Sequence, residues 1–129
     1  MAAALDAGGQ AIERHEGNTG WFRSGGYFDV DVSEYDPPDP IEDQFGFAPT
    51  VEIYFEIKKF ADFDAQETDV LGLSLGVLDR IPGDALLNYQ FIELWMLRKD
   101  GKLTINDELW KPKYRALIKQ PYESGPLSW

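Results

Sequence analysis

The chain contains no cysteine and only one histidine, His15, among its 129 residues. Without cysteine it has no disulfide framework, no thiol nucleophile and no cysteine-ligated zinc or iron–sulfur site. No apolar run approaches the roughly 20 residues that a membrane-spanning helix needs. The first residues also lack the basic segment and long apolar stretch of a secretory signal. We therefore expect a protein of the reducing cytoplasm that does not associate with a membrane.

Positive charge is scarce as well. Lys and Arg number 12 against 23 Asp and Glu, which gives a formal net charge of −11. Such a surface repels phosphate backbones and anionic lipids, so nucleic acid is excluded as a partner. It attracts cationic proteins and accelerates their encounter. The alternative interpretation is that the acidity only keeps the protein soluble.

The length and the 43% hydrophobic composition indicate one folded domain over residues 1–129, with residues 1–20 peripheral to it. Residues 2–15 suggest a short helix that Gly8 and Gly9 interrupt, and 17–20 a turn. Alternating apolar residues predict strands over 21–32 and 49–58, while the prolines of 36–45 predict a stiff loop.

A helical pattern runs from about 64 to 81, with a capping-box-like start at Asp64 and Glu67 and a stop at Pro82-Gly83. In residues 84–97 apolar side chains occupy both odd-numbered and even-numbered positions. This is typical of a central strand that is covered on both faces. Asp100-Gly101 predicts a hairpin, and Pro112 a short helix start before an irregular tail. The fold class is α+β: an antiparallel sheet of about four to five strands with the main helix, about 64–81, packed on one face.

The motifs that would indicate catalysis fail in their context. Gly72 to Gly76 reads Gly-Leu-Ser-Leu-Gly, the letters of a nucleophile elbow, but that elbow needs a strand, a strained turn and a histidine later in the chain. Here Ser74 lies inside a helical pattern and His15 precedes it. We predict small residues that pack the helix on the sheet, and no catalytic residue.

Carboxylates are concentrated between positions 29 and 64. A calcium loop is excluded because glutamate and proline stand where its glycine and bidentate acid belong, so we expect no metal and no cofactor. Glu52 and Glu56 can act as an acid–base pair only if one is desolvated. Strand alternation alone explains why Glu52 and Glu56 lie on a solvent-exposed face.

Between residues 45 and 122 the chain contains short blocks in a fixed order: Phe45 to Val51 (FGFAPTV), Lys58 to Phe60 (KKF), Pro82 to Ala85 (PGDA), Leu97 to Asn106 (LRKDGKLTIN), Leu109-Trp110 and Pro121-Tyr122. In these blocks the chain resembles a bacterial family, the swarming-inhibition (Sit) immunity proteins of the third type. The resemblance implies an immunity protein that binds and neutralises a cognate bacterial toxin. It transfers no catalytic or contact residues.

Charge and the resemblance together predict a partner-binding surface for a basic toxin. Its residues combine a row of carboxylates with tyrosines that supply apolar contact area: Asp29, Asp31, Glu34, Tyr35, Asp36, Glu52, Tyr54 and Glu56. Two alternatives remain open, an acidic interaction or regulatory domain of unrelated role and a small hydrolase. The sequence leaves the oligomeric state undetermined.

Overall fold

The computed structural model describes residues 2–33, 40–89 and 92–128. These residues form two compact units, the first from 2–33 and 49–80 and the second from 40–48, 81–89 and 92–128. Helices and two four-stranded sheets are both present, so the predicted α+β class is confirmed. Among the described residues no helix is both long and apolar enough to cross a membrane.

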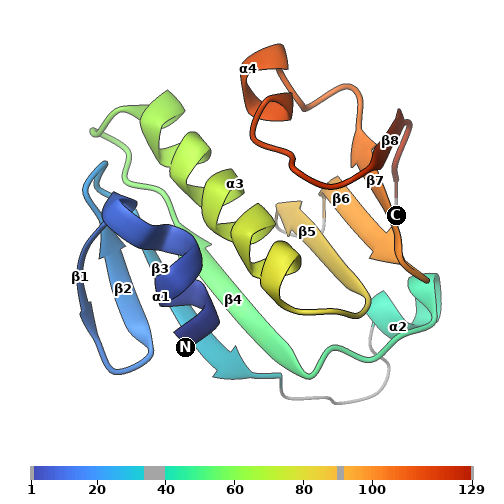
Figure 1. The fold of residues 1–129 in the computed structure, drawn as a ribbon, viewed down its shortest axis with the longest axis horizontal. Coiled ribbons are helices and arrows are strands. Elements are labelled where there is room, and N and C mark those ends of the chain that lie inside the picture. The colour runs from blue at the N-terminus through green and yellow to red at the C-terminus, as the bar shows by residue number, and fades with distance from the viewer. Residues whose placement is uncertain (1, 34–39, 90–91, 129) are drawn as a thin grey trace. The chain divides into compact units, whose positions relative to one another are not determined.

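The first unit is a four-stranded antiparallel sheet with helices on one face (Figure 1). Its strands follow the chain in the order β1 (Ile12–Glu16), β2 (Thr19–Phe22), β3 (Tyr27–Val32) and β4 (Val51–Glu56). The helices are α1 (Ala2–Gly8), which continues into the 3₁₀ turn η1 (Gly9–Ala11), and the long α3 (Phe63–Arg80). Every sheet neighbour is also a sequence neighbour, so short turns set most of the register.

The core of the first unit lies between the sheet and the helices. Its buried centre consists of Ala4, Phe22, Phe28 and Leu73, each at most 3% exposed, with Val30, Ile53 and Phe55 among the side chains packed around it. Gly20 faces this core, and a Cβ there would lie 2.4 Å from the Phe28 ring. The glycine therefore makes room for that ring.

Helix α3 covers nearly the predicted span, but its start and its glycines differ from expectation. Asp62 caps it: the carboxylate Oδ1 accepts the Ala65 N–H at 3.1 Å, two residues before the predicted capping position. A Cβ on Gly76 would lie 2.8 Å from the Ala7 Cβ, whereas nothing lies near Gly72. Gly76 thus allows helix α1 to pack closely against α3. The sequence had predicted a close approach of α3 to the sheet instead.

The second unit contains a mixed sheet in the order β5 (Ala85–Tyr89), β6 (Glu93–Lys99), β7 (Lys102–Asn106) and β8 (Tyr122–Gly125), together with the short helices α2 (Pro40–Phe45) and α4 (Pro112–Arg115). Strands β5 to β7 are antiparallel and β8 pairs parallel with β7. Asn106 is buried and donates to the carbonyls of Leu94 and Leu127 at 2.9 and 3.3 Å. This side chain ties the C-terminal segment to the sheet.

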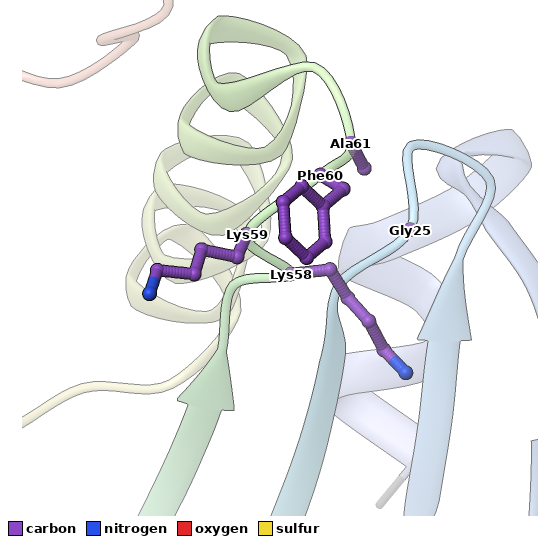
Figure 2. Close-up of a pocket in the computed structure, with 5 residues that line it drawn as sticks. All are labelled: Gly25, Lys58, Lys59, Phe60 and Ala61. Atoms are coloured by element: carbon purple, nitrogen blue, oxygen red, sulfur yellow. The ribbon is translucent and has the colours of Figure 1, made fainter.

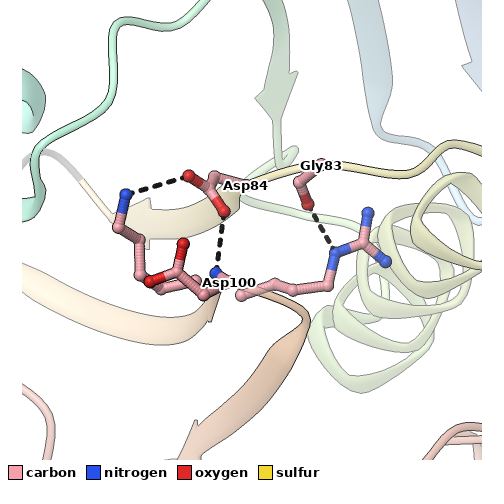
Figure 3. Close-up of polar contacts among 5 residues, drawn as sticks. Gly83, Asp84 and Asp100 are labelled. Atoms are coloured by element: carbon pink, nitrogen blue, oxygen red, sulfur yellow. Dashed lines mark hydrogen bonds and ion pairs between the residues drawn. The ribbon is translucent and has the colours of Figure 1, made fainter.

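The β6–β7 hairpin is held at its turn by Asp84 (Figure 3). One carboxylate oxygen accepts from Lys99 Nζ and the other from the Asp100 N–H, each at 3.0 Å. The hydrogen bond from Lys99, with that of Asp100 and the positive charge of Lys99, holds the pKa of Asp84 below its usual range. Asp100 and Gly101 both have positive φ, as the predicted Asp-Gly hairpin requires.

Several sequence-based boundaries change in the structure. Residues 2–16, expected to be peripheral, supply α1 to the core and form β1. The 21–32 segment is two strands joined by a turn at its glycines. Residues 40–45 form α2, because a proline fits the first turn of a helix. Positions 36–39 of the predicted loop lie outside the described residues.

The strand expected over 84–97 is a hairpin, closed by the Ile92 N–H that donates to the Tyr89 carbonyl at 2.9 Å. The sequence has no glycine or proline at this point, so the apolar pattern predicted one continuous strand. The tail contains β8 between Pro121 and Pro126, which both stand outside the strand on the edge of the sheet. The strands thus divide between two sheets.

Candidate partner-binding face

The side of the first sheet that faces away from the helices carries most of the candidate residues. In β3 and β4 the side chains alternate: Phe28, Val30, Ile53 and Phe55 pack toward the core, so Asp29, Asp31, Glu52, Tyr54 and Glu56 point to the other side. The register pairs Asp29 with Tyr54 and Asp31 with Glu52. Directly opposed side chains on one face lie about 4.5–5.5 Å apart at Cβ, so these five form one continuous group.

Strands β1 and β2 extend this group. Thr19 pairs with Asp29 and Trp21 with Tyr27, while Arg14 and Glu16 of β1 pair with Trp21 and Thr19. We call the resulting surface the acidic face, and define it by these residues: Arg14, Glu16, Thr19, Trp21, Tyr27, Asp29, Asp31, Glu52, Tyr54 and Glu56. It combines five carboxylates, one arginine and three aromatic rings.

Several carboxylates of the acidic face are oriented by hydrogen bonds. Asp29 accepts from the Thr19 hydroxyl at 2.8 Å, and Glu52 accepts from the Ser33 hydroxyl at 3.0 Å. Asp31 accepts from the Val32 N–H at 2.8 Å. These contacts consume one acceptor site of each carboxylate and leave others for a partner, because an ionised carboxylate has about four lone-pair sites.

The aromatic rings contribute apolar area among the charges. The Tyr27 and Tyr54 rings are tilted with centroids 6.3 Å apart, and Tyr54 is 60% exposed. The guanidinium of Arg14 lies 4.1 Å from the Trp21 ring centroid, a cation–π contact. A hydrogen bond to Glu56, assisted by slight burial and by that carboxylate's charge, raises the pKa of Tyr27, which keeps its hydroxyl protonated.

Of the eight residues named from sequence, the structure brings five together: Asp29, Asp31, Glu52, Tyr54 and Glu56. The other three, Glu34, Tyr35 and Asp36, lie outside the described residues. Sequence reasoning missed Arg14 and Glu16, because residues 2–15 were expected to form a short helix. It also missed Trp21 and Tyr27, which lie within the predicted strand segment 21–32. The Gly17-Asn18 turn followed by alternating residues was the signal for a hairpin there.

The residues considered for chemistry lie apart from one another. Ser74 is buried in the middle of α3, and His15 is exposed on β1. Within residues 2–33, 40–89 and 92–128, no group of three or more His, Asp or Glu side chains is placed to hold a metal ion. Glu52 and Glu56 are both exposed on the acidic face.

Aromatic side chains are enriched in protein–protein interfaces, whereas surface charges act mainly on the rate of encounter. The chain matches the family model described as SitI3-like over residues 1–114, which is most of its length, and it belongs to that family. The match includes the first 44 residues, which the sequence blocks did not reach. The family name suggests a Sit immunity protein. No protein with a curated description and no solved structure matches the chain.

Proposed function

We propose that this chain is an immunity protein that binds a cognate bacterial toxin in the cytoplasm and neutralises it by occupying its working surface. Membership of the SitI3-like family supports an immunity role. The acidic face supports binding as the means, because it offers oriented charge and aromatic contact area on a packed sheet. On this proposal the protein performs no reaction and acts in a stoichiometric complex.

The toxin in this proposal carries a basic surface. The acidic face holds Glu16, Asp29, Asp31, Glu52 and Glu56 against the single cation Arg14, whose guanidinium is already stacked on Trp21. Complementary charge raises the rate of encounter, and desolvated aromatic anchors then supply residence time. Trp21, Tyr27 and Tyr54 are the anchors on this face.

Co-expression tests the function. Cells that express the toxin encoded beside this chain's gene should survive when the chain is present, and titration of purified toxin activity should end at one chain per toxin. Inhibition at far lower ratios would indicate catalytic inactivation, and failure to rescue would remove the immunity role. Rescue by the chain with no complex in solution would also contradict neutralisation by binding.

The face is tested by charge-neutral, nearly isosteric variants. Asp29→Asn with Asp31→Asn keeps the Thr19 hydrogen bond possible while it removes two charges, and rescue should weaken. Asp107→Asn with Glu108→Gln is the control, because it changes the net charge equally at exposed positions of the second unit. Equal rescue by both pairs would show that the acidic face is not the contact surface.

A further inference from the structure

The loop between β4 and α3 exposes an aromatic side chain completely. Phe60 has a relative exposure of 101%, the highest among the exposed large apolar residues that the structure describes. A single exposed apolar residue is ordinary. Phe60 is different because the backbone on both sides of it is fixed, a hollow lies beside it and two lysines precede it.

Gln66 of α3 fixes the loop from below. Its side chain is fully buried; Oε1 accepts the Lys58 N–H at 2.6 Å and Nε2 donates to the Lys58 carbonyl at 2.9 Å. Nε2 also lies 3.3 Å from the carbonyl of Asp62, the residue that caps α3. The residues on either side of Phe60 are therefore tied to the same buried amide. Because the backbone is restrained on both sides of Phe60, little backbone freedom is lost when the ring binds.

The β2–β3 turn supports the loop from the side. A Cβ on Gly25, which has a φ of +118°, would lie 2.9 Å from the Ala61 Cβ. A Cβ on Gly26 would lie 2.8 Å from the Glu56 carbonyl oxygen and 3.2 Å from Gln66 Oε1. Both glycines thus let the turn pack directly against the loop and against the Gln66 side chain that holds it.

A shallow hollow of about 300 Å³ lies where the turn meets the loop, lined by Gly25, Lys58, Lys59, Phe60 and Ala61. Figure 2 shows the Phe60 ring and the Lys58 side chain on the side of the loop toward Gly25, with Lys59 directed the other way. The surface there is an apolar ring and hollow with a cation on each side. Its charge is opposite to that of the acidic face, although Glu56 and Lys58 are only two residues apart.

We propose that residues 58–61, the Phe60 loop, form a second anchor for the toxin, in which Phe60 enters an apolar pocket whose rim carries carboxylates. This inference rests on the proposed function. Charge complementarity selects the occupant: Lys58 and Lys59 require acidic groups around the pocket, whereas the acidic face requires basic ones. The reversal of charge beside Glu56 fixes how one partner can lie across both surfaces.

The two surfaces then govern different rate constants. Exposed charges on the acidic face mainly set the association rate, whereas an apolar side chain buried in a pocket mainly sets the dissociation rate. Surface-immobilised toxin from the neighbouring gene is the probe, and the full chain is the analyte. Phe60→Ala should raise the dissociation rate at least tenfold and change the association rate less than about twofold.

Three further variants sharpen this test. Phe60→Leu keeps an apolar group and should recover part of the residence time. Lys58→Glu with Lys59→Glu reverses two exposed charges and should slow association, most strongly at low salt. Ile92→Ala removes another exposed apolar side chain, 72% exposed in the second unit, and should bind as the wild type does.

The outcomes separate this inference from the function on which it rests. If the wild type binds and rescues while Phe60→Ala dissociates at the wild-type rate, the second anchor is refuted and the immunity role stands. If the wild type neither binds nor rescues, both fail. Sedimentation of the chain alone that reveals a dimer, lost in Phe60→Ala, would assign the loop to a second copy and overturn the proposal.

Discussion

Replacement of Gln66 by leucine tests the clamp beneath the Phe60 loop. Leucine has a similar volume, so the change removes hydrogen bonds without opening a large cavity. The Lys58 N–H, which donates to Oε1 at 2.6 Å, loses its partner beside a fully buried position. One buried unpaired group costs about 1–3 kcal/mol, and we expect that loss in the free energy of unfolding.

Urea unfolding at neutral pH measures this loss, with hydrogen exchange of the Lys58 amide as a local readout. Gln44→Leu is the control, because Gln44 is exposed in α2, and it should change stability by less than about 0.5 kcal/mol. Gln66→Glu tests the burial of this position through pH. A buried carboxylate is disfavoured when charged, so the loss in the free energy of unfolding should grow as pH rises above about 4. If Gln66→Leu is as stable as the control and the Lys58 amide exchanges at the wild-type rate, the clamp does not exist.

Three other predictions concern the fold. Leu73→Ala, which truncates a side chain 1% exposed in the core of the first unit, should lower the free energy of unfolding by about 2–5 kcal/mol; a loss below 1 kcal/mol in urea unfolding would contradict the assigned core. Gly72→Ala should stabilise the protein by up to about 1 kcal/mol through helix propensity, whereas Gly76→Ala should be less stable than Gly72→Ala, because its Cβ would meet Ala7 at 2.8 Å; the reverse order would place α1 elsewhere. Asp84→Asn should destabilise the hairpin at pH 7. Because the folded pKa of Asp84 is lowered, its contribution is present above about pH 4 and is lost as pH falls through the folded pKa. A thermal-unfolding difference that does not shrink toward pH 3 would refute that origin.

The parts of the fold that sequence predicted are those where one local signal dominates. The alternation of Val51 to Ile57 defined β4, and the periodic apolar residues before Pro82 defined α3 nearly to the residue. The Asp100-Gly101 pair gave the hairpin because both positions adopt positive φ. Each of these signals is read from neighbouring residues.

The parts that sequence missed depend on contacts between distant residues. Strand β1 is polar and exposed along most of its length, so it shows no alternation, and only pairing with β2 makes it a strand. That pairing brings Arg14 and Glu16 to the acidic face. The role of Gly76 likewise depends on α1, which lies about 70 residues earlier. The clamp by Gln66 was invisible because glutamine in a helix gives no signal of burial.

The acidic face could be predicted only where its residues follow from alternation within a single strand. Asp29, Asp31, Glu52, Tyr54 and Glu56 follow from alternation within two strands, and their register needs only that β3 and β4 pair. Trp21 and Tyr27 join the face through the β2–β3 turn, which falls inside the segment 21–32 that was predicted as strand. Side chains assembled by turns are harder to predict than side chains on one strand.

The rate at which the chain associates with the toxin that it is proposed to neutralise, measured from low to high salt, tests the central claim most directly. Asp29→Asn with Asp31→Asn should slow association about tenfold at low salt, and the difference should vanish near 0.5 M salt, where the screening length falls to a few ångströms. The equally charged control Asp107→Asn with Glu108→Gln should stay close to wild type. If both pairs slow association equally, net charge and not the acidic face attracts the partner, and the account is contradicted.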